Sequence, residues 1–134
     1  PWAERVRMIE PLFNQPSYVG AKKMLDATML RSQAIAKNIA NLETPNYRRV
    51  DLSPSFQAEL KRALGSGDVR QIATVRPSLM TSTAAVSSSQ DGNTVRMERE
   101  LMELSQNALQ HTLQTQLISG RLSRLRLAIT GRPV

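Results

Sequence analysis

The sequence predicts an all-α protein built on two long helices, one in each half of the chain, separated by a long and mostly irregular middle segment. Apolar residues recur at alternating steps of three and four in two stretches, which is the heptad-type pattern of packed helices. Forty per cent of the residues are apolar, yet only 4% are aromatic. This mixture suits long helices packed side by side better than a compact globular core. The length of 134 residues fits one domain.

Residues 1–16 precede the first periodic stretch and predict a flexible tail that orders on a partner. They contain three prolines and show no clean periodicity. They also lack the apolar stretch of a cleaved secretory signal, so we expect any export to use a route without one. No run of about 18 apolar residues occurs in the chain, which argues against a membrane-spanning helix.

The first long helix is predicted over residues 17–42. Ser17 can serve as its N-cap, and Pro45 sets its latest end because the residue before a proline is disfavoured in a helix. Two small polar residues stand at the middle of its stripe. The stripe consists of Tyr18, Ala21, Leu25, Thr28, Ser32, Ile35, Ile39 and Leu42.

The middle segment, residues 43–93, predicts one short helix at 54–64. Pro54 suits the first helical position, apolar residues follow at steps of four, and Gly65 provides a stop. The remainder is rich in Ser, Thr and Ala and predicts a loop that is disordered before assembly. A brief strand at 69–75 is a weaker possibility.

The second long helix is predicted over residues 94–130, capped by Asn93 or Thr94 and ended by Gly131. At about 1.5 Å per residue it would be roughly 55 Å long. Glutamates lie near its start and arginines near its end, which complements the helix dipole. Its stripe consists of Met97, Leu101, Leu104, Ala108, His111, Thr115, Ile118, Leu122, Leu125 and Ile129.

This helix also carries a second apolar row, formed by Met102, Leu109, Leu113 and Leu117. A hairpin of two helices covers only one stripe, so the second row needs another cover. Either neighbouring subunits or the middle segment can provide it. We favour neighbouring subunits, because the chain has only two long helices, and we predict that this row is an inter-subunit face.

The residues needed for catalysis or for a cofactor do not occur in a recognisable arrangement. There is no cysteine, which excludes disulfides and thiolate chemistry. The single histidine, His111, lies on the helix stripe and is a poor metal site, because metal ligands come in threes or fours. No glycine-rich phosphate loop is present. We therefore expect a protein that is not an enzyme and has no cofactor.

The net charge of +7 raises the main alternative, a basic helical nucleic-acid-binding protein. Four arginines gather near the C-terminus, but apolar helix positions separate them and no recognition motif accompanies them. A membrane-surface helix is a third option, and the glutamates early in the same helix argue against it. The C-terminal arginines are Arg121, Arg124, Arg126 and Arg132.

A short motif at the end of the first helix resembles a known signature. It reads Asn38-Ile-Ala40-Asn41-Leu-Glu-Thr44-Pro45-Asn-Tyr47-Arg48. This resembles the Asn-x-Ala-Asn-x-x-Thr-Pro-x-Tyr-basic signature of the flagellar axial family, which comprises rod, hook and hook-associated proteins. Asn46 stands where the family commonly has Gly, and Asn also tolerates a left-handed turn.

Two further stretches resemble the proximal rod members of this family. One is the continuation Arg48-Arg49-Val-Asp51-Leu with Phe56 after it. The other is the C-terminal pattern that begins Asp91-Gly-Asn93-Thr94-Val and extends to Gly131. The resemblance covers about residues 12–132.

The resemblance implies a structural rod subunit that surrounds the export channel. It implies that residues 17–42 and 94–130 form the inner axial core as an antiparallel, coiled-coil-like hairpin. The implied partners are copies of the chain, other rod subunits, the rod adapter FliE, the MS-ring protein and the flagellar type III export apparatus. The implied location is the rod in the periplasmic space, with no cleaved signal peptide, no direct membrane insertion and no nucleic acid.

Matching the two stripes by size and polarity predicts the register of this hairpin. Ile39 then meets Leu101, Ile35 meets Leu104, and Thr28 lies where His111 can reach its hydroxyl. The residues predicted to pack between the helices are Leu25, Ile35, Ile39, Leu42, Leu101, Leu104, Ala108, Ile118, Leu122, Leu125 and Ile129.

Overall fold

The computed structural model describes residues 2–4, 7, 15–82 and 92–131 of the chain. Most of the predicted tail at 1–16, and residues 83–91 of the predicted middle segment, lie outside the described residues. The described part is mostly helical, as the sequence predicts. In chain order its elements are α2 (Pro16–Ala40), β1 (Val50–Leu52), α3 (Ser55–Ser66), α4 (Val69–Thr74), β2 (Leu79–Thr81) and α5 (Met97–Thr130).

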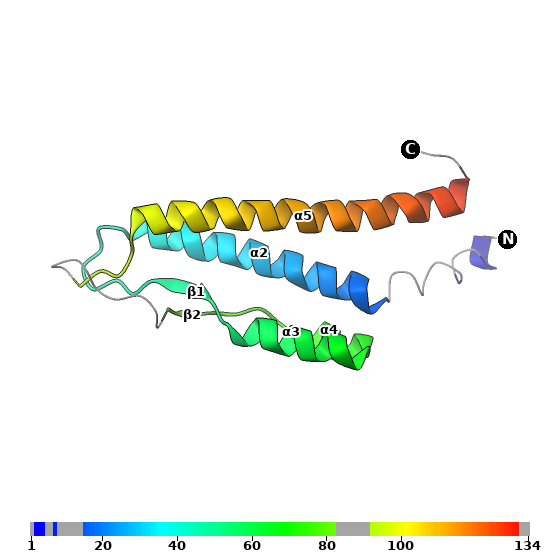
Figure 1. Cartoon of the computed structure of the whole chain (residues 1–134), viewed down its shortest axis with the longest axis horizontal. Coiled ribbons are helices and arrows are strands. Elements are labelled where there is room, and N and C mark those ends of the chain that lie inside the picture. The colour runs from blue at the N-terminus through cyan, green and yellow to red at the C-terminus, as the bar shows by residue number, and fades with distance from the viewer. Residues whose placement is uncertain (1, 5–6, 8–14, 83–91, 132–134) are drawn as a thin grey trace.

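The two long helices lie side by side and run in opposite directions (Figure 1). α2 begins at Pro16, whose ring pre-sets the helical backbone and whose missing N–H costs nothing at a first turn. Its last helical residue is Ala40, two residues before the predicted end. α5 has 34 residues, about 50 Å, and ends at Gly131, where φ is +67°.

The described part of the middle segment, residues 43–82, forms a packed layer against α2, which corrects the prediction that the segment is mostly irregular. α3 and α4 lie on the side of α2 away from α5, so that α2 is the central layer (Figure 1). Apolar side chains from α2, α3 and α4 form the buried core here. They are Ala27, Phe56, Leu60, Ala63, Ile72 and Val75.

A small antiparallel sheet corrects the prediction of an all-α fold. β1 pairs with β2 so that Val50 lies opposite Thr81 and Leu52 opposite Leu79. The stretch at 69–75, where a brief strand was an option, is instead α4, because the carboxylate of Asp68 caps it by accepting from the Arg70 N–H at 2.9 Å. Gly67, with φ +68°, ends α3, so the predicted stop at Gly65 is two residues early.

None of the described helices is both long enough and apolar enough to cross a membrane. The cap of α5 also differs from prediction. Arg96 occupies the position before the helix, and the side chains of Asn93 and Thr94 bond to residues elsewhere in the fold.

Candidate functional site

Asn38 joins the end of α2 to the start of β1. Its side chain is fully buried, and its Nδ2 donates to the Val50 carbonyl at 2.8 Å while its Oδ1 accepts from the Val50 N–H at 2.9 Å. The amide therefore pairs with Val50 as a neighbouring strand would. Nδ2 also donates to Glu100 at 3.2 Å, and the Tyr47 hydroxyl donates to Oδ1 at 3.3 Å. One side chain thus contacts three elements.

Asn41 caps α2 by donating from Nδ2 to the Lys37 carbonyl at 2.8 Å, as its place in the sequence suggests. The Thr44 hydroxyl donates to Asn41 Oδ1 at 3.1 Å and holds the following turn. Asn46 has φ +59°, the left-handed conformation that Asn tolerates. The remaining predicted motif residues, Ala40, Pro45 and Arg48, are exposed.

The segment before α5 closes over this turn. Asn93 Nδ2 lies within 2.8–3.0 Å of three carbonyl oxygens at the end of α2, those of Asn41, Leu42 and Thr44. Its Oδ1 accepts from the Val95 N–H at 2.7 Å. These contacts attach the segment before α5 to the turn that follows α2, whose Asn41 and Thr44 carbonyls also accept backbone N–H groups within the turn.

Two neighbours of Asn93 complete the closure. The Thr94 hydroxyl accepts from the Arg49 N–H at 2.8 Å, and the Thr94 N–H donates to the Tyr47 carbonyl at 3.1 Å. Gly92 has φ +76° and passes so close that a Cβ there would stand 2.5 Å from Asn46 Oδ1. The motif at 38–48 and the first described residues of the C-terminal motif, 92–100, therefore form one structural unit.

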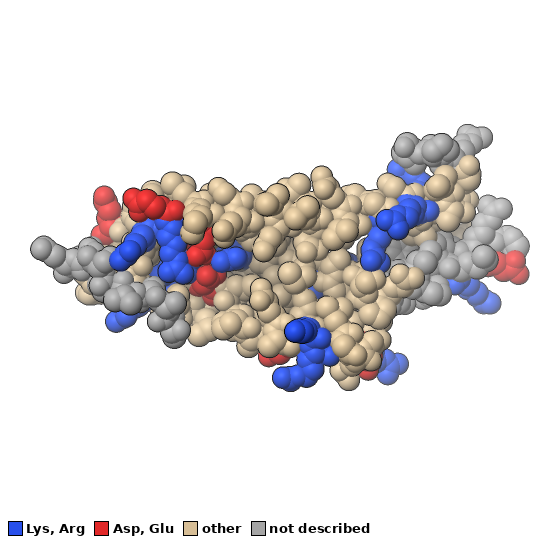
Figure 2. Space-filling view, viewed as in Figure 1, with Lys and Arg blue, Asp and Glu red and all other residues tan. Residues whose placement is uncertain are grey.

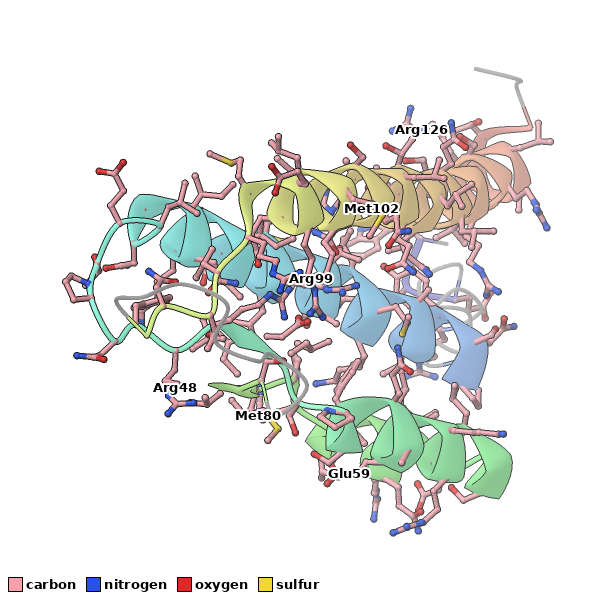
Figure 3. All side chains as sticks on the ribbon, turned by 60° about the vertical axis from the view of Figure 1, so that its left-hand side comes forward. Arg48, Glu59, Met80, Arg99, Met102 and Arg126 are labelled. Carbon is pink, nitrogen blue, oxygen red and sulfur yellow. The ribbon has the colours of Figure 1, made fainter. Side chains whose placement is uncertain are left out.

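A buried group of charges lies beside this unit, and we call it the Arg49 cluster. Arg49 is 1% exposed, and its guanidinium donates from Nε to Glu100, from Nη2 to Glu103 at 2.8 Å and from Nη1 to Asp51 at 3.1 Å. Arg31 and Arg99 bond the same carboxylates from α2 and α5, and Figure 3 shows Arg99 reaching from α5 toward α2. The cluster comprises Arg31, Arg49, Asp51, Arg99, Glu100 and Glu103.

The cluster contains three arginines and three carboxylates, so its charges balance. Burial works against the charged form of Asp51, but the Leu52 N–H and the charges of Arg31 and Arg49 outweigh it and lower the pKa of Asp51 below its ordinary value. Burial likewise opposes the charged guanidinium of Arg49, yet its bonds to Glu100 and Asp51 raise its pKa further. Burial, with the charge of Glu100, raises the pKa of Tyr47.

Over residues 100–107, the face that α5 turns toward α2 is polar, which corrects the first half of the predicted packing stripe. Its buried residues are Glu100, Glu103 and Asn107, whereas Leu101 and Leu104 are 51% and 39% exposed. The cause is the Arg49 cluster, because Arg49 can be buried only if Glu100 and Glu103 point at it. Successive helix residues are about 100° apart, so this choice turns Leu101 outward.

The predicted packing residues therefore divide into two groups. Leu25, Ile35, Ile39, Leu42, Ile118 and Leu125 are buried or half-buried. Leu101, Leu104, Ala108, Leu122 and Ile129 are exposed.

The predicted meeting of Thr28 and His111 is present. The Thr28 hydroxyl and His111 Nδ1 are 3.1 Å apart, and the same hydroxyl donates to the Leu25 carbonyl. One turn earlier, Asn107 Nδ2 donates to the Thr28 carbonyl and to the Ser32 hydroxyl, both at 2.8 Å. Polar pairs thus set the register of α2 and α5. The sequence predicts the pair of Thr28 and His111 but not the bonds of Asn107.

The second apolar row of α5 has no cover within the described residues. Met102, Leu109, Leu113 and Leu117 are each more than half exposed. α3 and α4 pack on α2, so this part of the middle segment does not shield the row. We call these four residues the outer face of α5. Among the described residues no group of three His, Asp or Glu side chains is placed to hold a metal.

Comparison with known proteins identifies the family. No family model matches the chain. The chain is 38% identical over 109 residues to the flagellar basal body rod protein FlgB of Cereibacter sphaeroides, covering 75% of this chain and 84% of that protein. It is 30% identical to FlgB of Escherichia coli strain K12 and 28% identical to FlgB of Borrelia hermsii, which cover 75% and 81% of this chain, and 83% and 92% of those proteins.

These relatives are structural rod proteins and not enzymes, and they give no support to the nucleic-acid-binding alternative. The resemblance in the two motifs thus extends over most of the chain. The chain belongs to the FlgB family of flagellar basal body rod proteins.

Proposed function

We propose that this chain is a subunit of the proximal rod, the part of the flagellar drive shaft next to the MS ring. It polymerises by packing the outer face of α5 against neighbouring subunits. The observation that carries the proposal is the exposure of Met102, Leu109, Leu113 and Leu117 on one helix. Monomeric soluble proteins rarely leave an apolar surface of this extent uncovered, and such surfaces mark interaction sites.

The inner axial domain in this proposal is the pair of α2 and α5, acting as an antiparallel coiled-coil-like hairpin. The motif at 38–48 and the Arg49 cluster fix the rotation of α5, which decides which residues it presents outward. The structural role of the axial motif is then to orient the assembly face. The bonds of Asn38 to β1 and to Glu100 support this role.

The proposed partners are copies of the chain, other rod subunits, the rod adapter FliE and the MS-ring protein. The proposed route to the rod is the flagellar type III export apparatus, without a cleaved signal peptide, and the proposed location is the periplasmic space. The names of the relatives, which place them in the basal body rod, support this assignment.

A paired substitution on the outer face tests the assembly role. In a strain that lacks the gene, the double variant Leu109→Glu, Leu113→Glu should yield basal bodies with an MS ring but no rod, and cells that do not swim. The matched control is Met80→Glu, because Met80 is a 40% exposed apolar residue on β2, away from α5 (Figure 3).

Circular dichroism of both purified proteins should show that they remain folded, because each replaced side chain is exposed. Complete rods with the double variant, seen by electron microscopy, would contradict the proposal. Loss of rods with Met80→Glu alone would place the assembly contact on β2 instead.

A further inference from the structure

The two long helices diverge at the end opposite the Arg49 cluster. α2 tilts away from α5 toward its own N-terminus (Figure 1). The space between them is a cavity of about 340 Å³, which we call the wedge, and this volume is within the range of ligand pockets. It is lined by Gln15, Ser17, Tyr18, Arg121, Leu122, Arg124, Leu125 and Ala128.

The wedge combines an apolar wall with positive charge. Leu122, Leu125 and Ala128 supply apolar surface on α5, and the ring of Tyr18 faces them from α2. Arg121 and Arg124 form no ion pair within the described part of the chain, in contrast to the arginines of the Arg49 cluster. Lys22 adds a third cation, with its Nζ 5.8 Å from the centre of the Tyr18 ring.

No carboxylate of the long helices lies close enough to balance this charge. α5 has no acidic residue after Glu103, and the first acidic residue of α2 is Asp26, two turns beyond Tyr18. Figure 2 shows basic side chains over the last turns of α5, whereas acidic and basic side chains lie together at the start of this helix. An occupant of the wedge must therefore bring both apolar and acidic groups.

A second copy of this chain does not meet that requirement. Its longest apolar surface is α5, and Glu98 is the one exposed carboxylate on that helix, because Glu100 and Glu103 are buried in the Arg49 cluster. Three of the four outer-face residues, Leu109, Leu113 and Leu117, lie after Glu103, where α5 has no acidic residue. The last turns of α5 would bring further arginines to the wedge.

We propose that the wedge binds an acidic amphipathic helix of a different protein. Its apolar row lies against Tyr18, Leu122 and Leu125, and its carboxylates accept from Arg121 and Arg124. An amphipathic helix laid into an apolar groove is a recurrent mode of recognition, and paired charges at the rim select the partner. This contact is separate from self-association through the outer face of α5.

The test uses two synthetic peptides of about 20 residues, long enough for appreciable helix formation. Both carry leucines at alternating steps of three and four. One has glutamates beside the leucines, and the other has glutamines at the same positions. Fluorescence anisotropy at 0.15 M salt measures their binding to the full chain. The acidic peptide should bind about tenfold more tightly than the neutral one.

The variant Arg121→Gln, Arg124→Gln should weaken binding of the acidic peptide about tenfold. The control Arg126→Gln should leave binding within about twofold, because Arg126 does not line the wedge and points away from α2 (Figure 3). Amide resonances of Tyr18, Leu122 and Leu125 should shift when the acidic peptide is added. The outer-face double variant should bind the peptide as the parent does.

Three outcomes would overturn the proposal. Equal weakening by Arg126→Gln would show attraction to net charge alone. Peptide binding that is unchanged in the Arg121 and Arg124 variant would place the contact elsewhere. Vesicles containing phosphatidylglycerol that bind through these arginines, while the peptide does not, would make the wedge a lipid site.

Discussion

The two ends of the α2–α5 pair differ in how their charged side chains are paired. The closed end consists of residues 31–40 of α2 and 97–107 of α5 with the flanking Asn41 and Asn93. There, buried arginines and carboxylates neutralise one another and asparagines bond the backbone. At the open end, where α5 ends beside the start of α2, Arg121 and Arg124 form no ion pair with the described residues, and apolar side chains line a cavity. One end of the helix pair thus fixes the geometry of the pair, and the other end exposes surface that a partner can contact.

The largest effect should come from breaking the closed end at Arg49. Arg49→Met leaves Glu100 buried without its main partner and should lower the free energy of unfolding by about 3–5 kcal/mol. Arg99→Met is the control, because the Arg99 side chain is 38% exposed and, within the described part of the chain, bonds Glu103 alone. This variant should cost no more than about 1 kcal/mol. Urea unfolding followed by circular dichroism measures both, and equal losses would show that the cluster does not hold the fold.

Replacing the two asparagines of the axial motif should also have unequal effects on stability, because one is buried and the other is not. Asn38→Ala removes a fully buried amide and leaves the N–H and carbonyl of the half-buried Val50 without this partner, which should cost about 2–3 kcal/mol. Asn41→Ala removes an exposed cap of the Lys37 carbonyl and should cost less than about 1 kcal/mol. The same urea titration measures both losses in the free energy of unfolding. A larger loss for Asn41→Ala than for Asn38→Ala would mean that the motif stabilises the fold by capping the helix and not by attaching β1.

Alanine substitutions at two glycines compare the closed end, where Gly92 lies, with the later part of α5, where Gly120 lies. Gly92→Ala should destabilise the fold by more than about 1 kcal/mol, since it combines a positive φ with a clash against Asn46. Gly120→Ala should stabilise it by about 0.5–1 kcal/mol, because nothing lies within 4 Å of the added Cβ and alanine favours a helix. Thermal melting of both variants is the measurement. A stabilising Gly92→Ala would show that the close approach to Asn46 does not persist in solution.

The smallest expected effect is a dependence of the free energy of unfolding on acidic pH. The folded state holds the pKa of Asp51 below its ordinary value, so an unfolded chain takes up this proton at a higher pH than the folded chain. The contribution of Asp51 is complete above about pH 4 and is lost as the pH falls through the lower, folded pKa. Urea midpoints between pH 6 and pH 2 should therefore fall less steeply for Asp51→Asn than for the parent. Identical slopes would contradict the proposed influence of Arg31 and Arg49.

Periodicity and turn chemistry determined much of this protein from sequence alone. The spacing of apolar residues predicts α2 and α5 to within a few residues, because helix formation depends on local pattern. Matching Thr28 with His111 predicts their contact, since a buried imidazole needs a polar neighbour. The motif at 38–48 predicts the family, and the similarity to FlgB proteins confirms it.

Only the tertiary structure decided which face of α5 packs inward. An apolar stripe indicates that a helix is amphipathic, but it does not distinguish a face covered by the chain itself from one covered by a partner. Glu100 and Glu103, which the sequence indicates only as acidic residues that complement the helix dipole, are buried because Arg49 from a distant segment meets them. Pairing between buried charges depends on contacts far apart in the chain, and this pairing turns the leucines of α5 outward.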